Sequence, residues 1–137
     1  ARVDDAEQLA DDLTSVGLAC DGSWTAALMK KTAHPRVGTH PHSDNFDLGA
    51  GHPYPRYLGL DELMPWAKAF SARSYEFDAG GEETRIDFDR LARIVSAAGY
   101  SGWIGIEYDG PVLPEQEGIA RTVALARRAF GKTVVTK

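Results

Sequence analysis

The chain has 137 residues, of which 43% are hydrophobic and 26% charged, and this suits one ordinary globular domain with its own core rather than two domains. Its formal net charge of -5 at pH 7 disfavours nucleic acid or an anionic membrane as the main partner, and no apolar run approaches the roughly 20 residues of a membrane span. A single cysteine, Cys20, excludes an internal disulfide, and with no secretory signal at the start we expect a cytoplasmic protein.

The first part of the chain predicts two helices, a short strand and a long loop. Ala6–Leu13 has only a thin apolar face and predicts a short helix. Ser23 is a good N-cap residue for a helix over Trp24–Lys31. Arg36–His40 is a brief strand candidate. Pro41–Tyr57 is rich in proline and glycine and predicts a loop of about 17 residues, a length that is often functional.

The middle of the chain predicts a helix, a strand and a second helix. Leu60–Phe70 has apolar residues on one side, and Pro65 predicts a late start or a kink. Ser71–Phe77 reads as a strand because its side chains alternate, with one face formed by Ser71, Arg73, Tyr75 and Phe77. Asp87 is placed to cap a helix over Phe88–Ala98, which carries a clear apolar stripe.

The last part of the chain predicts one more strand and helix. Trp103, Ile104 and Ile106 form a short apolar run, which Asp109-Gly110-Pro111 ends. A helix is predicted over Glu115–Phe130, followed by a loose tail over Lys132–Lys137, and its inward residues are expected to be Ile119, Val123, Ala126 and Phe130. Strand candidates that recur about every 30 residues, with helices between them, indicate an α/β fold with a parallel sheet.

One carboxylate falls where such folds place their chemistry. Glu107 comes at the end of the last predicted strand, and parallel sheets carry their sites at the carboxyl ends of strands. Burying an unpaired carboxylate costs several kcal/mol or more, so Glu107 is expected to have either a functional role or a charged partner. It is either a ligand or catalytic base, or one half of a structural ion pair.

The segment His40-Pro41-His42-Ser43-Asp44 is a candidate metal site. Residues two apart in an extended chain face the same way, so His40, His42 and Asp44 are placed to converge on one ion. Imidazole and carboxylate ligands suit zinc, manganese or iron(II). The alternative is a polar loop whose histidines face solvent.

Arg73 is a candidate substrate contact. A guanidinium makes paired hydrogen bonds to planar anions, so Arg73 is suited to a phosphate or carboxylate of the substrate. The alternative is a surface pair with Glu76 or Asp78.

Three segments resemble the sugar phosphate isomerase/epimerase family, the xylose isomerase-like TIM barrels. Between about Gly17 and Gly131 the chain is similar to the C-terminal half of these barrels. The segments that resemble the sixth, seventh and eighth strands are His34-Pro-Arg-Val-Gly-Thr-His-Pro41, Ser71-Ala-Arg-Ser-Tyr-Glu-Phe-Asp78 with Glu83-Thr-Arg-Ile-Asp87 after it, and Gly99-Tyr-Ser-Gly-Trp-Ile-Gly-Ile-Glu-Tyr-Asp-Gly110.

The resemblance implies a chemistry and a set of roles. A divalent ion (manganese, magnesium, zinc or cobalt) would bind the hydroxyl and carbonyl oxygens of a small sugar or sugar phosphate, and carboxylates would move a proton next to the carbonyl. Glu107 matches the metal ligand of the eighth strand and is also the expected base. His42 or Asp44 would be the second ligand, and Arg73 and His40 would be substrate contacts.

The chain departs from the family in two respects. Where family members read Pro-Asp-Phe-Gly-Asn-Phe, it reads Pro41-His-Ser-Asp-Asn-Phe46, so His42 stands at the position of the metal-binding aspartate. A closed barrel takes about 250 residues, so residues 1–137 would form one partial barrel, with a weakly determined start over 1–16 and a tail over 132–137. We therefore expect self-association or pairing with a missing barrel half.

The alternative function is a non-catalytic half-barrel, or a fragment, whose metal site has decayed and which acts in binding or assembly.

Overall fold

The computed structural model describes residues 17–49 and 52–131, so the helix predicted over Ala6–Leu13 and the tail over Lys132–Lys137 lie outside the described residues. The described elements, in chain order, are η1 (Leu18–Cys20), α2 (Gly22–Thr32), α3 (Arg56–Leu63), η2 (Met64–Trp66), β1 (Phe70–Ser74), α4 (Phe88–Ala97), β2 (Ile104–Tyr108) and α5 (Glu115–Gly131). The protein is thus a mixed α/β structure with a small parallel sheet. In the part of the chain that is described, no helix combines the length and apolar character needed to cross a membrane.

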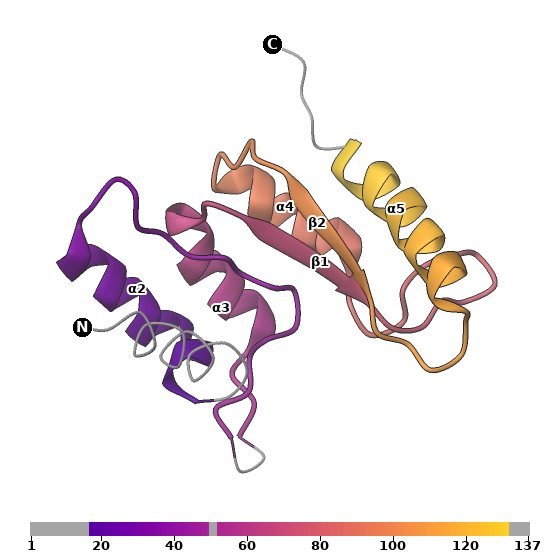
Figure 1. The fold of residues 1–137 in the computed structure, drawn as a ribbon, viewed down its shortest axis with the longest axis horizontal. Coiled ribbons are helices and arrows are strands. Elements are labelled where there is room, and N and C mark those ends of the chain that lie inside the picture. Colours follow the sequence, from indigo (N-terminus) through magenta and orange to yellow (C-terminus); the bar gives the residue numbers. More distant parts are fainter. Residues whose placement is uncertain (1–16, 50–51, 132–137) are drawn as a thin grey trace, which may run out of the picture.

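The sheet pairs β1 with β2 in parallel, and α4 makes the connection between them (Figure 1). The register aligns Ser71 with Gly105 and Arg73 with Glu107. A third segment adds to the other edge of β1 through a parallel bridge between His42 and Ser71, where the Ser71 amide donates to the Pro41 carbonyl at 3.0 Å.

The strand predicted over Arg36–His40 is therefore only partly formed. Thr39 bridges Ala67 in parallel, and the next bridge falls beyond the predicted range, at His42. Pro41 interrupts this edge because proline has no amide hydrogen to donate. We refer to residues 39–43 as the edge segment.

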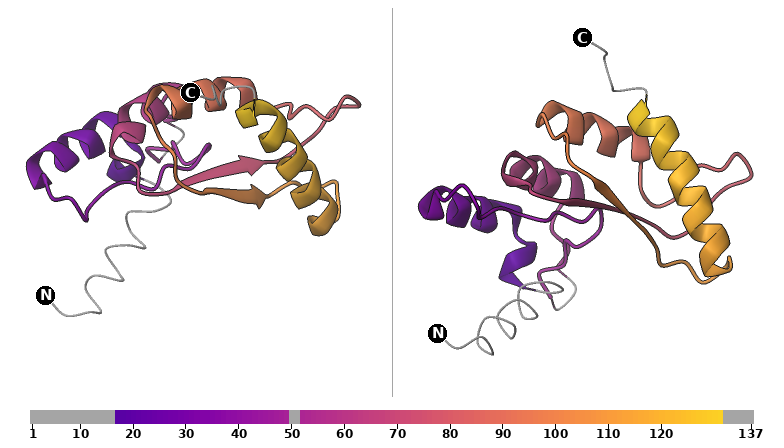
Figure 2. Two further views of the ribbon diagram at one scale, coloured as in Figure 1. Left: turned by 90° about the horizontal axis from the view of Figure 1, so that it is seen from above. Right: turned by 45° about the horizontal axis from the view of Figure 1, so that its top comes forward.

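Helices α2, α3 and α4 lie on one side of the sheet, and α5 slants past the carboxyl ends of the strands, as the view from above shows (Figure 2). Phe70 and Ala72 point toward the helices and are buried, and the partly buried Ile104 and Ile106 pack against the same core. Because side chains alternate along a strand, their neighbours face the opposite side. No helix of the described residues covers that side, which we call the open face.

Two helix boundaries differ from those predicted. Asp21, not Ser23, is the N-cap of α2, and its carboxylate accepts from the Trp24 amide at 2.9 Å. The helix predicted over Leu60–Phe70 begins and ends earlier than expected, because α3 runs over Arg56–Leu63. It gives way to the 3-10 turn η2 (Met64–Trp66), which contains Pro65, so the interruption predicted at that proline is found. Proline lacks the amide that an α-helix needs at that point. The cap predicted for α4 is confirmed, since the Asp87 carboxylate accepts from the Arg90 amide at 2.8 Å.

The buried face of α5 is rotated from the predicted one. Ile119 is 36% exposed, while the buried residues of this helix are Gly118, Thr122, Leu125, Ala126 and Ala129. Gly118 lies against the Tyr108 ring, where a Cβ atom would come within 2.2 Å of a ring carbon, and the hydroxyls of Thr122 and Ser74 are 2.5 Å apart. Close approach to the strands thus selects small and hydroxyl side chains, which apolar periodicity does not reveal.

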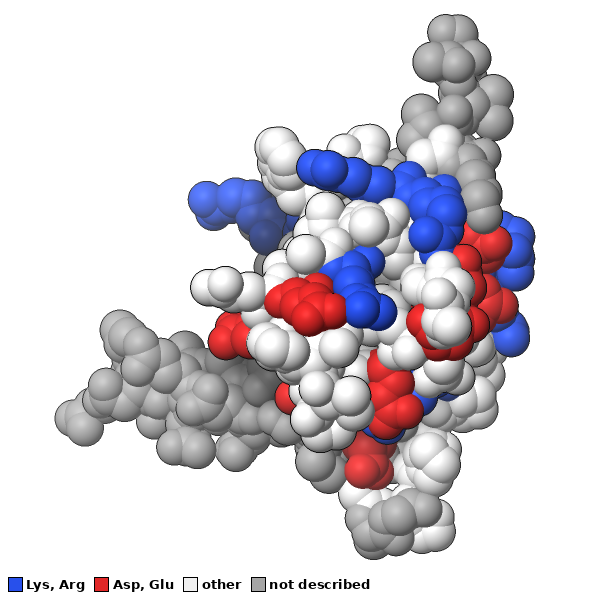
Figure 3. All heavy atoms as spheres, turned by 90° about the vertical axis from the view of Figure 1, so that its right-hand side faces the viewer, with Lys and Arg blue, Asp and Glu red and all other residues white. Residues whose placement is uncertain are grey.

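The face that carries α5 has mixed charge, with Lys and Arg side chains interspersed among those of Asp and Glu (Figure 3). On this helix Arg121 pairs with Glu117 at 2.7 Å, and Arg128 pairs with Glu82 at 2.5 Å. Exposed pairs of this kind contribute little to stability.

Candidate site on the open face of the sheet

Glu107 and Arg73 form a cross-strand ion pair on the open face. Arg73 Nε and Nη2 each lie 3.0 Å from Glu107 Oε2. Burial by itself raises the pKa of Glu107, but the hydrogen bond from Arg73, the charge of His42 and a hydrogen bond from Ser71 outweigh it and lower the pKa below its ordinary value. Glu107 is therefore ionised at neutral pH. The surface pair of Arg73 with Glu76 or Asp78, left open by the sequence, is not the one formed.

His42, on the edge segment, lies next to this ion pair. Its Nδ1 atom lies 3.2 Å from Glu107 Oε1, but the approach falls outside hydrogen-bond geometry, so this buried nitrogen has no hydrogen-bond partner among the described residues. Burial is the main cause of a lowered pKa, with the charges of His40 and Arg73 acting in the same sense and Glu107 in the opposite sense. The ring is consequently neutral at neutral pH.

His40 lies beside His42, with the two ring centroids 4.8 Å apart. Its Nε2 atom is 3.0 Å from the Ser71 hydroxyl. The predicted convergence of the two histidines is thus confirmed, and the next strand adds Ser71, which the sequence did not single out.

Asp44 takes a different position from the one predicted. Its carboxylate forms an ion pair with Arg56 at the start of α3. The Tyr75 hydroxyl interacts with both Asp44 and Arg73, and its pKa is raised, mainly by burial. Tyr75 follows Ser71 and Arg73 at spacings of two, and that alternation is the sequence signal that would have identified it. No comparable pattern in the sequence identified Arg56, because it pairs with Asp44 across the loop that separates them.

The predicted metal set of Glu107, His42 and Asp44 is not assembled by the described residues. Within 17–49 and 52–131, no three His, Cys, Asp or Glu side chains are grouped so that they could hold a metal ion. Two donors remain, His42 Nδ1 and Glu107 Oε1, and the other oxygen of that carboxylate is held by a guanidinium. These residues do not fit a complete metal centre. Further ligands would have to come from outside them.

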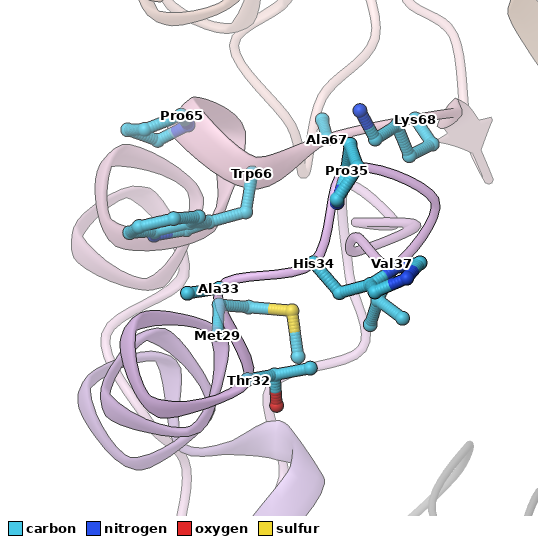
Figure 4. Close-up of a pocket in the computed structure, with 10 residues that line it drawn as sticks. All are labelled: Met29, Thr32, Ala33, His34, Pro35, Val37, Pro65, Trp66, Ala67 and Lys68. Atoms are coloured by element: carbon cyan, nitrogen blue, oxygen red, sulfur yellow. The ribbon is translucent and has the colours of Figure 1, made fainter.

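Two cavities adjoin α2. One has a volume of about 450 Å³ and lies between α2 and residues 38–46, with His40 and His42 in its wall. The other, of about 420 Å³, is lined by Met29, Trp66 and Lys68 among others (Figure 4). The second cavity contacts residues that precede β1, at the opposite end of the strand from Arg73, and therefore has no part in the Glu107 site.

The site thus consists of an ionised carboxylate, a guanidinium, two imidazoles and a serine hydroxyl on adjacent parallel segments. It offers hydrogen-bond donors and acceptors to a small polar ligand. Neither the scan against protein-family models nor the search of curated proteins finds a match to this chain.

Proposed function

We propose that the chain is a sugar isomerase/epimerase-like protein that moves a proton next to the carbonyl of a small sugar, a sugar phosphate or a carbonyl-bearing polyol. The observation that carries this proposal is the Arg73–Glu107 pair, with Arg73 Nε 3.0 Å from Glu107 Oε2, on the open face beside His42. A carboxylate and a guanidinium in contact are suited to act on the two ends of one reacting unit, a C–H bond and the carbonyl next to it.

The reaction begins when the Arg73 guanidinium moves from Glu107 to the substrate. When the guanidinium turns to the carbonyl oxygen of the substrate, Glu107 loses the hydrogen bond that lowers its pKa, and its basicity rises. Glu107 then accepts the proton of the neighbouring C–H bond. The electron pair of that bond forms the C=C bond of an enediolate, whose negative oxygen Arg73 stabilises.

Return of the proton completes the reaction. Delivery to the adjacent carbon, while the hydroxyl proton passes from one oxygen of the enediolate to the other, gives isomerisation. Epimerisation requires instead that the original carbon takes a proton on its opposite side, and solvent on that side is the donor. The neutral His42 and the exposed His40 are placed to hydrogen bond substrate hydroxyls. No step of this reaction runs through a metal ion, since the described residues supply only two donors.

The fold supports a partial TIM barrel. The edge segment, β1 and β2 are parallel neighbours, with α2, α3 and α4 on one side. The contacts of His40 with Ser71 and of Arg73 with Glu107 lie on the other side. In a closed barrel the open face would line the interior, and a second copy or another barrel half would cover both free edges.

A second candidate is a half-barrel that binds or assembles without catalysis. It is favoured by the same ion pair, since a carboxylate with a lowered pKa is a weak base as long as Arg73 remains on it. The two candidates differ in whether any substrate loses a proton to Glu107.

Solvent exchange provides the test. The chain is incubated in D2O with small aldoses, ketoses and their phosphates, and loss of the proton signal next to the carbonyl is followed by NMR. We expect Glu107→Gln to slow exchange at least about a hundredfold, the usual contribution of a general base, while the exposed Glu76→Gln leaves it unchanged. Equal exchange in the wild type and Glu107→Gln overturns the role of Glu107. No exchange with any sugar favours the non-catalytic candidate.

A further inference from the structure

The cavity between α2 and residues 38–46 has the composition of a site for an apolar group. Its volume of about 450 Å³ lies within the range of small-molecule sites. Trp24 and Leu28 are each 40% exposed there, so both retain apolar surface that a ligand can cover. The same wall includes Met29, Phe46 and Leu63.

The cavity is lined without any carboxylate, ammonium or guanidinium group. Its lining contains no Asp, Glu, Lys or Arg residue, and its polar side chains are those of Thr25, Thr39, Asn45, His40 and His42. A phosphate or carboxylate placed here would lose its hydration without gaining a counter-ion, whereas an aryl or alkyl group would lose only contact with water.

The cavity adjoins the Glu107 site at the two histidines. His40 and His42 line the cavity, their rings are 4.8 Å apart, and His42 Nδ1 is 3.2 Å from Glu107 Oε1. A ligand whose polar part contacts Glu107 and Arg73 therefore has an uncharged, apolar space directly beyond the imidazoles. Along such a ligand, polar contacts with Glu107 and Arg73 would give way to apolar contacts with Trp24 and Leu28.

We propose that this cavity holds an apolar substituent of the ligand, so that a sugar or polyol that carries an aryl or alkyl group binds more tightly than the same sugar without that group. This proposal rests on the proposed function, because it assigns the polar end of the ligand to Glu107 and Arg73. It adds the substrate class, and it makes Trp24 and Leu28 the residues that determine specificity.

The test compares the binding of two glycosides that share one sugar and have no free carbonyl to react, 4-nitrophenyl β-D-glucopyranoside and methyl β-D-glucopyranoside, by isothermal titration calorimetry. Burial of the aryl ring should make the nitrophenyl glycoside bind at least about tenfold more tightly to the full chain. Leu28→Gln, which replaces apolar wall with a polar side chain, should reduce this preference to about threefold or less. Leu58→Gln is the matched control, since Leu58 is 49% exposed on α3 and lies outside the cavity lining.

Equal affinities for the two glycosides overturn the proposal, as does a preference that survives Leu28→Gln unchanged. Light scattering distinguishes a protein occupant. If Leu28→Gln converts a dimer to a monomer and both glycosides bind equally, a second copy occupies the cavity, and the proposal is wrong. The Glu107-dependent exchange reaction fails or succeeds separately, because it is measured on unsubstituted sugars.

Discussion

Glu83 is expected to be among the most sensitive polar positions of the fold, although it is not in the candidate site. Glu83 as a residue is 8% exposed. Its carboxylate accepts from the backbone amides of Tyr75 at 3.1 Å, Glu76 at 3.2 Å and Arg85 at 2.7 Å, and also from the amide of Ile86. One side chain thus satisfies four amides of the loop after β1 and holds the backbone of Tyr75 beside Arg73.

The cost of removing this carboxylate follows from which amides water can reach. Glu76 and Arg85 are exposed, so water replaces the carboxylate there at little cost, whereas Ile86 is 1% exposed and Tyr75 is half-buried. Each buried amide left without an acceptor costs about 1–3 kcal/mol. Glu83→Ala should therefore lower the free energy of unfolding by roughly 2–5 kcal/mol.

Urea denaturation followed by circular dichroism measures this difference, with the slope of free energy against urea concentration checked for constancy. Glu76→Ala is the matched control, because an exposed substitution should change stability by no more than about 0.5 kcal/mol. A loss of less than about 1 kcal/mol in Glu83→Ala would show that the loop does not depend on the carboxylate, and would refute this reasoning.

Two further predictions concern the candidate site. Burial lowers the pKa of His42 below 6.5 in the folded chain, so its contribution to stability is complete above pH 6.5 and is lost as the pH falls toward the folded value. Thermal melts at about pH 7.5 and about pH 5.5 should therefore show a smaller acid-induced decrease of the melting temperature in His42→Asn than in the wild type, while the exposed His52→Asn behaves like the wild type. Because the described residues present only two donors, with Arg73 on the same carboxylate, excess manganese should leave the melting temperature unchanged. An increase that disappears in Glu107→Gln would reveal additional ligands and contradict this expectation.

The local patterns in the sequence predicted those parts of the fold that depend on periodicity. The apolar stripe and cap of α4, and a parallel sheet with Glu107 beside the carboxyl ends of its strands, are confirmed. The proximity of His40 and His42 followed from their spacing of two residues.

The pairs that join distant segments were not predictable in the same way. Asp44 contacts Arg56 across the loop, and Arg73 contacts Glu107 across the sheet, 34 residues away in sequence. Any acidic residue near Arg73 in the sequence was an equally good candidate, because charge pairing has no periodicity. Only the register of β1 against β2 decides between them. The inward face of α5 was predicted in part: Ala126 is buried and Phe130 packs against the core. The burial of Gly118 and Thr122 was missed because it comes from close approach rather than from apolar character.

The alignment of Arg73 with Glu107 has a consequence for folding fidelity. A slip of β2 by one residue would turn Glu107 toward the helices and Ile106 toward solvent, since neighbouring side chains point to opposite faces. The slipped arrangement would bury a carboxylate away from Arg73, at a cost of several kcal/mol. The charged pair therefore specifies the register of β1 against β2. Selection for correct folding would keep both charges even in a related sequence without catalytic activity.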